Sequence, residues 1–306
     1  MMRRGSKTLS ISLKQRLPIT ELLADETKEE CMPSIQLQGK IFLKGTINAL
    51  TGLHIGGNSG ELDIGGIDNP VIRNAFNRQP YIPGSSLRGK MRGLLDRHFN
   101  KPLEKRVGRD VRVHECQTSA DYDKCPVCQA FGVAPQGALR GKTMPTRVIV
   151  RDTFLTQGSL DVLNIADTDT DFTEIKTEVA IDRITSAATP RQQERVPAGA
   201  TFGPFQIVHS LYTQHENDRS NQLQGELQFF DTVLTGLELL EDDYLGGSGS
   251  RGSGQIAFEN LEMTFKSRGC YENADIAPIT IAENVDIKTL RQSDYTAKIL
   301  EAVSVK

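Results

Sequence analysis

The sequence predicts an α+β, ferredoxin-like body in which elements follow the order βαββαβ, with insertions. Residues 35–48 alternate between apolar and polar side chains, which is typical of a strand with one buried face. Residues 87–99 and 223–240 carry apolar side chains at steps of three or four, which predicts two amphipathic helices. Further strands are predicted at residues 146–152, 205–212 and 256–265.

Composition favours an ordinary soluble protein with one decorated domain. The chain has 306 residues, of which 38% are hydrophobic and 25% charged. No apolar run approaches ~20 residues, so we expect no membrane span. The basic N-terminus lacks an apolar signal core, and the five cysteines do not form a dense disulfide framework. We therefore expect a cytoplasmic protein.

The pattern divides the chain into a body with extensions at both ends. Residues 1–33 form a polar extension, either an arm for a neighbouring subunit or a frayed terminus. The body spans 34–266, and residues 267–306 form a polar tail with a weak terminal helix. Within the body we expect an insertion at 100–142 and a projecting two-stranded ribbon at 172–203. The ribbon is expected to turn across residues 186–193, with Pro190 in the turn.

A cluster of soft metal ligands lies in the insertion. The motif supplies four ligands within fifteen residues, with Cys-x-x-Cys spacing at its end. This ligand set and spacing are typical of tetrahedral zinc, so we predict a closed structural Zn²⁺ site. A redox pair and four unrelated residues are the alternatives. The predicted ligands are His114, Cys116, Cys125 and Cys128.

Charge is distributed unevenly along the chain. Residues 84–112 hold nine Lys and Arg against three acids, whereas residues 213–243 hold eight acids against one arginine. The first segment is compatible with a polyanionic partner. The alternative interpretation is two unrelated solvated faces.

The stretch 51–68 is the candidate active site. It follows the first strand and contains His54, the glycine pairs Gly56-Gly57 and Gly65-Gly66, and Asp68. Glycine-rich loops can lie close against a foreign backbone, and loops on rigid scaffolds often carry function. The structural alternatives are a packed loop histidine and a turn aspartate that bonds its own backbone.

Two nucleotide-binding patterns are only partly matched. Residues 84–91 follow the P-loop pattern up to Met91, which replaces the hydroxyl needed for magnesium. Residues 247–252 fit G-x-G-x-x-G, but a predicted helix precedes them and a strand follows, the reverse of a dinucleotide fold. We expect this second loop to offer backbone amides and Arg251 to phosphates, the alternative being a flexible connector.

Five motifs in order resemble a known family. They are TGLHIGG, GGIDNPVIR, YIPGSSLRGKMRGLL, EVAIDRITSAATPRQQERVPAGATF and DYLGGSGSRGSGQIAF. Together they resemble the repeated RAMP superfamily backbone subunit of type III-A and III-D CRISPR effector complexes. The resemblance covers about three quarters of the chain, and the cysteine cluster is similar to the zinc-binding insertion of some members.

The resemblance implies an RRM-like palm with a β-hairpin thumb at 172–203. It implies a subunit that binds CRISPR guide RNA, stacks with copies of itself or related subunits, joins other effector-complex subunits, and acts as an endonuclease. Target RNA would be cut at regular intervals, with Asp68 as the catalytic residue and a divalent cation such as Mg²⁺ assisting. The candidate RNA-binding residues are His54, Gly56, Gly57, Ser85, Ser86, Arg88, Lys90, Arg92, Arg183, Arg191, Gly247, Ser248, Gly249 and Arg251.

Two other functions remain open from the sequence. A catalytically silent guide-RNA scaffold would share nearly all of these motifs, because binding and cutting use the same loops. A P-loop nucleotide hydrolase is the more distant alternative. The sequence leaves open whether Asp68 acts as a base or as a metal ligand.

Overall fold

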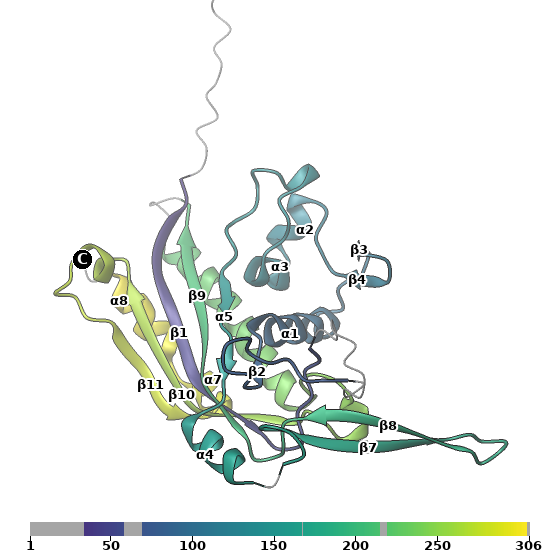
Figure 1. The fold of residues 1–306 in the computed structure, drawn as a ribbon. Helices are drawn as coiled ribbons and strands as arrows, with labels where there is room; N and C mark the ends of the chain where they lie inside the picture. The colour runs from purple at the N-terminus through teal and green to yellow at the C-terminus, as the bar shows by residue number, and fades with distance from the viewer. Residues whose placement is uncertain (1–33, 58–68, 167, 215–218, 305–306) are drawn as a thin grey trace, which may run out of the picture. The chain divides into compact units, whose positions relative to one another are not determined.

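Strand β1 (Gln36–Ala49) lies at the centre of an antiparallel five-stranded sheet of order β11-β10-β1-β9-β5 (Figure 1). The computed structural model describes residues 34–57, 69–166, 168–214 and 219–304. The predicted first strand is thus confirmed. The other strands of this sheet are β5 (Val148–Val150), β9 (Thr201–Thr213), β10 (Ile256–Ser267) and β11 (Ile279–Val285).

Alternation along β1 sets the two faces of the sheet. Ile41, Leu43 and Ile47 are completely buried beneath the helices. Lys40 and Lys44 point to the other face and are only half-buried. Phe42, the one large apolar residue out of phase, lies on that half-exposed face as well. Period-two patterning therefore decides which face of the central strand enters the core.

Helices α1 (Gly84–His98) and α5 (Arg219–Glu241) pack against each other and against the sheet. Gly236 of α5 lets the two helices approach, since a Cβ there would lie 3.0 Å from Leu95 Cδ1. In α1 the apolar stripe is narrower than predicted: Leu94 is half-buried and Phe99 caps the helix end, partly exposed. All six predicted apolar residues of α5 are buried: Leu223, Leu227, Phe230, Leu234, Leu237 and Leu240.

The segment after β10 is more structured than the sequence predicts. Strand β11 extends the sheet, and helices α7 (Ile287–Gln292) and α8 (Tyr295–Ser304) pack against α5 or the outer strands. The expected weak terminal helix corresponds to α8. Strand β11 and helix α7 were not predicted, because the few apolar residues of this segment stand among many polar ones. A short helix, α6 (Gly269–Glu272), precedes them.

The region between α1 and β5 consists of short elements. They are β3 (Lys105–Val107), β4 (Val111–Val113), α2 (Ser119–Asp123), α3 (Pro126–Phe131) and the 3₁₀ turn Gly137–Leu139. Helix α3 packs on α1 and α5. Elsewhere β2 (Tyr81–Ile82) pairs with β6 (Thr153–Phe154). Helix α4 (Gln157–Ile165) follows β6 and packs against β9.

A separate two-stranded ribbon is formed by β7 (Glu174–Ile181) and β8 (Ala188–Arg195). It extends away from the five-stranded sheet in Figure 1. The predicted turn was wrong: Pro190 lies inside β8 opposite Val179, and the chain reverses at residues 182–187. Asp182 makes that turn instead, because its carboxylate accepts hydrogen bonds from the backbone amides of Ile184 and Thr185.

A buried ion pair joins α5 to the residue directly before β5. Arg147, 2% exposed, donates Nε and Nη2 to the two carboxylate oxygens of Glu226 at 2.7 and 2.5 Å. A further donor of Arg147 meets Gln129, and its guanidinium lies 4.8 Å from the centre of the Phe229 ring. Burial alone would lower the pKa of Arg147, but Glu226 raises it above its ordinary value.

None of the helices in the described part of the chain is long and apolar enough to span a bilayer.

We predict that Glu226→Ala lowers the free energy of unfolding by about 3–5 kcal/mol, because the Arg147 charge would stay buried without its partner. Urea denaturation followed by circular dichroism measures this. The matched control is Glu238→Ala, which removes the exposed partner of Arg291 and should cost no more than ~1 kcal/mol. Equal, small effects of both variants would contradict a structural role for the buried pair.

Candidate functional site

The glycine-rich loop after α5 packs directly on the loop that contains His54. The amide of Gly247 donates to the His54 carbonyl at 2.8 Å. Gly246 has φ +79, and a Cβ at this position would lie 2.1 Å from the same carbonyl oxygen. Only glycine meets both conditions. The two loops that the sequence separates by almost 200 residues therefore form one surface.

Part of the surface that the glycine-rich loops were expected to offer to phosphates is occupied by protein side chains. A Cβ on Gly249 would meet the Tyr244 ring at 2.0 Å, so this glycine serves internal packing. Gly56 remains exposed, and Gly57 is half-exposed. Among the described residues, the amides of Ser248, Gly249 and Ser250 have no acceptor. Consecutive free amides beside a left-handed residue, here Ser248 at φ 62, form an anion-binding concavity.

His54 is held in one orientation. Its Nδ1 lies 2.6 Å from the Glu194 carbonyl, so Nδ1 donates to that oxygen and fixes the ring. Nε2 lies 3.6 Å from the position of a Cβ on Gly56, and Cδ2 faces Gly247. The ring is 9% exposed. His54 thus lies between the two glycine loops.

The chain re-enters the described part at Asn69 and is fastened at once to the ribbon. The Asn69 carbonyl accepts from the Glu194 amide at 3.2 Å. Next to it, Gly57 donates to the Pro70 carbonyl and Ile72 to the Ile55 carbonyl. Asp68, the predicted catalytic residue, precedes Asn69 but lies outside the described residues.

The carboxylate of Glu194 is the centre of this junction. It accepts from the Val71 amide at 2.7 Å, from Arg73 Nη2 at 2.5 Å and from Thr173 Oγ1 at 2.6 Å. Burial alone would raise the pKa of Glu194, but these hydrogen bonds hold it below its ordinary value. We call the end of the ribbon where β7 begins at Glu174 and β8 ends at Arg195 the ribbon root. Glu194 therefore ties the ribbon root to the segment after Asp68.

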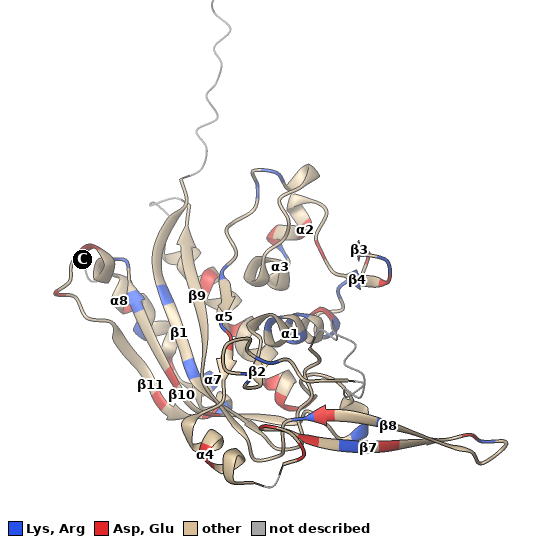
Figure 2. Ribbon diagram, viewed as in Figure 1, with Lys and Arg blue, Asp and Glu red and all other residues tan. Residues whose placement is uncertain are grey.

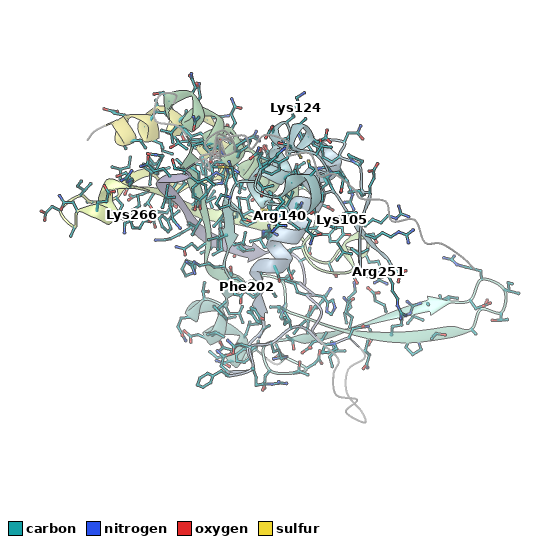
Figure 3. All side chains as sticks on the ribbon, turned by 90° about the horizontal axis from the view of Figure 1, so that it is seen from above. Lys105, Lys124, Arg140, Phe202, Arg251 and Lys266 are labelled. Atoms are coloured by element: carbon teal, nitrogen blue, oxygen red, sulfur yellow. The ribbon has the colours of Figure 1, made fainter. Side chains whose placement is uncertain are left out.

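Arg251 is a bridge between the glycine-rich loop and the ribbon. Its Nη2 donates to Ser248 Oγ at 2.7 Å, and its Nη1 lies 3.0 Å from Glu178 Oε2 on β7. Ser248 Oγ also donates to Gln193 Oε1 on β8 at 3.0 Å. Figure 3 shows Arg251 beside the ribbon, where about half of its side chain is exposed.

The ribbon arginines lie farther out. Arg183 is in the turn at the ribbon end and Arg191 is on β8, directly opposite Glu178. Both side chains are exposed. The predicted RNA-binding residues of the ribbon are thus accessible.

The predicted residues of α1 differ in accessibility. Ser85 is exposed and Ser86 half-exposed at the helix start. Arg88 donates to the Phe131 carbonyl, and Arg92 donates to the carbonyls of Gly132 and His114 at 3.1 and 3.0 Å. Lys90 pairs with Asp243 at 2.9 Å and lies 3.4 Å from the centre of the Tyr244 ring. Arg88, Lys90 and Arg92 therefore hold the insertion and the glycine-rich loop.

The P-loop alternative is excluded by the same helix. Residues 84–90 are the first turns of α1 rather than a loop, and Met91 is completely buried. They form no phosphate-cradling loop.

The four predicted metal ligands converge. The donor atoms of His114, Cys116, Cys125 and Cys128 all lie within 4.8 Å of one another, and all four residues are buried. His114 Nδ1 lies 3.0 Å from the Pro102 carbonyl, which leaves Nε2 facing the sulfurs of Cys116 and Cys125 at 3.5 and 3.4 Å. A ring fixed through its second nitrogen is typical of metal-binding histidines. The donor set fits a tetrahedral metal ion.

The three thiols of the cluster shift one another's pKa. The Cys128 thiol donates to Cys125 and lowers the pKa of Cys125 to about 4. Burial raises the pKa of Cys116 to about 11, and the bond to Cys125 raises the pKa of Cys128. A divalent cation bound here would favour the thiolate form of all three cysteines. The cysteines are free thiols in the described chain.

Sequence reasoning missed the residues that organise the junction, above all Glu194, Arg73 and Gln193. Each is a charged or polar residue in a stretch that we assigned to a solvent-exposed ribbon or loop. The available signal was the pairing of an acid at the ribbon root with a basic residue just after the candidate active-site loop.

Comparisons with known proteins identify the family. The model of the RAMP superfamily matches residues 46–257. A protein of Methanocaldococcus jannaschii named CRISPR system Cms endoribonuclease Csm3 is 40% identical over 244 residues, 79% of this chain and 87% of the relative. The protein of that name from Streptococcus thermophilus is 36% identical over 254 residues, 83% of this chain and 96% of the relative.

Solved structures similar to this chain are consistent with the family found by sequence comparison. A Csm3 in the crystal structure of a Csm3–Csm4 subcomplex of the type III-A CRISPR-Cas interference complex has a TM-score of 0.51 and 28% identity, covering 87% of this chain and 97% of that one. The Methanopyrus kandleri Csm3 crystal structure, at 22% identity and a TM-score of 0.54 over 88% of this chain and 98% of that one, supports the fold. The chain therefore belongs to the RAMP superfamily and, within it, to the Csm3 family.

Proposed function

We propose that this protein is a guide-RNA-binding backbone subunit of a type III CRISPR effector complex and cleaves target RNA within it. The observation that carries the proposal is the junction of the His54 loop, the glycine-rich loop, the ribbon root and the segment that begins at Asn69. The relatives' name, endoribonuclease, supports the reaction. The type III-A subcomplex supports an assembly with other effector subunits.

The fold supports a ferredoxin-like, RRM-like palm with a thumb. The order β10-β1-β9-β5, with α1 and α5 packed on the sheet, is the arrangement that βαββαβ connectivity produces. We propose that the β7–β8 ribbon is the thumb, which would separate target nucleotides at intervals. Its exposed apolar tip, with Ile184 93% exposed, suits an insertion between bases.

Guide RNA would bind at the two glycine loops. We propose that phosphates meet the free amides near Ser248, with Arg251, His54 and the exposed backbone at Gly56 and Gly57 beside them. These groups would contact the RNA backbone, whereas base pairing between guide and target would select the target sequence. Other proposed contacts are Ser85, Ser86, Arg183 and Arg191. Arg88, Lys90 and Arg92 would first have to leave their protein partners, so we propose that they act mainly by positioning the insertion and the glycine-rich loop.

Cleavage would use the target's own 2′-hydroxyl as the nucleophile. A nucleotide displaced by the thumb can adopt the in-line geometry that attack on the adjacent phosphate requires. We propose that Asp68 takes the proton of that hydroxyl or holds a divalent cation; such a cation would stabilise charge on the phosphate. The His/Cys cluster would hold structural Zn²⁺ and brace residues 100–142.

Asp68→Ala should slow target cleavage in the assembled complex by at least ~100-fold, because a positioned general base or cation ligand contributes about that much. Gel analysis of labelled target measures cleavage, and filter binding measures guide and target affinity, which should not change. Asp63→Ala, in the same glycine-rich stretch, is the matched control. Undiminished cleavage by Asp68→Ala would leave the silent scaffold as the better description.

Glu194→Gln should reduce the cleavage rate roughly tenfold or more while target affinity stays within about twofold. The amide keeps the shape but loses the charge that orients Arg73 and the segment after Asp68, and small misplacements are costly in catalysis. Glu174→Gln is the control, since Glu174 pairs with Arg195 at the same ribbon root without contacting that segment. If both variants cleave equally well, Glu194 does not position the site.

Purified protein should contain close to one equivalent of zinc per chain, measured by mass spectrometry of the metal. Cys128→Ser should lose the metal and make residues 100–142 sensitive to protease, because the ligands hold short elements together. Cys270→Ser, outside the cluster, should retain both the metal and the protease resistance. Zinc-free, protease-resistant wild-type protein would count against a structural metal.

A further inference from the structure

The basic surplus of residues 84–112 separates into two groups in the structure. Three cations on α1 are engaged, since Arg88 and Arg92 donate to backbone carbonyls and Lys90 pairs with Asp243, whereas Arg97 near the helix end is exposed. The remaining cations lie mainly on the β3–β4 hairpin, which carries blue segments in Figure 2. The sequence alone placed the RNA-binding charge on the helix, whereas most of the accessible charge of residues 84–112 is on the hairpin.

Three arginines of this hairpin have no partner in the described part of the chain. Arg106, Arg109 and Arg112 are exposed, and none of them has a hydrogen bond or ion pair with any described residue. Lys105 is different, because it pairs with Glu115 at 2.8 Å. The hairpin therefore presents three guanidinium groups to solvent within seven residues.

Two of these arginines lie directly opposite each other. The strand register pairs Arg106 with Arg112, so both side chains project from the same face of the hairpin. Like charges in directly opposed positions destabilise a strand pair. An anion between the two guanidinium groups would convert this repulsion into attraction, and a phosphate accepts such hydrogen bonds in pairs. The opposite face carries the uncharged pair Val107 and Val111.

The hairpin is anchored at both ends to the His/Cys cluster. β4 ends at Val113, next to His114, and the carbonyl of Pro102 before β3 is held by His114 Nδ1. Glu115 ties Lys105 to the backbone amide of Ala134. A hairpin fixed in this way keeps its arginine pair in place before any ligand binds, which lowers the entropic cost of binding.

We propose that the arginine face of the β3–β4 hairpin binds the sugar-phosphate backbone of an RNA strand, as a contact separate from the glycine loops. The proposal rests on the proposed function, which supplies RNA as the polyanion near this subunit. Across residues 101–113 five cations stand against two acids, Glu104 and Asp110, which favours a polyanion. The pairwise geometry of Arg106 and Arg112 favours phosphate over scattered carboxylates on a protein surface.

The test is the binding of labelled single-stranded RNA to the full-length chain at several salt concentrations. Arg106→Gln with Arg112→Gln should reduce the slope of log affinity against log salt by about 1.4, because each phosphate contact contributes about 0.7. At 0.1 M salt the affinity should fall about 25-fold, as two such contacts each contribute about fivefold. The matched control is Arg268→Gln with Arg291→Gln, which removes the same charge from two exposed ion pairs.

The outcomes are distinguishable. If wild-type protein binds no RNA, the proposed function fails. If wild-type binds RNA but the hairpin variant matches the control in affinity and slope, the hairpin proposal is overturned. It is equally overturned if the variant binds RNA like the control and loses only its assembly with other subunits, since the hairpin would then dock protein. Zinc content equal to that of wild type verifies that the variant is folded.

Discussion

The buried carboxylate of Glu194 is the constraint on which the arrangement of the site depends. A carboxylate that is 2% exposed is stable only if its charge is compensated, and here an amide, a guanidinium and a hydroxyl provide the compensation. These donors come from two separate segments, 71–73 and 170–173, and the acceptor belongs to the ribbon. Satisfying one charge therefore fixes the ribbon root and the segment 71–73 together.

The backbone of the same residue extends this constraint to the glycine loops. The Glu194 carbonyl orients His54, and the His54 carbonyl in turn accepts from Gly247. Ser248 then returns to the ribbon through Gln193. Hydrogen bonds thus close a ring through ribbon and loops, so that a displacement of one member is transmitted to the others. A surface that must hold one strand and expose another to attack benefits from such rigidity.

The periodicity of apolar residues predicted the body of the protein well, because burial of those residues determines its secondary structure. β1, α5 and β10 carry large apolar residues at the period of their structure, and those residues are in the core. The convergence of the His/Cys cluster was also predictable, since ligand type and spacing define such a cluster locally. The burial of Glu194 and Arg147 could not be predicted, because charged residues are normally exposed to solvent. Only the fold shows that each has a partner distant in the sequence.

Charge counting failed for a related reason. A cation on a sequence segment is a ligand-binding candidate only if the fold leaves it unpaired, and pairing depends on neighbours that composition does not reveal. On α1 the neighbours are the carbonyls of the insertion and Asp243, so those cations stabilise the protein. On the hairpin, Arg106 and Arg112 have no such neighbours among the residues that the structure describes, and the strand register forces them together. Unpaired cations held close to one another lower their energy by binding an anion, and this makes them the stronger candidates for contact with a nucleic acid.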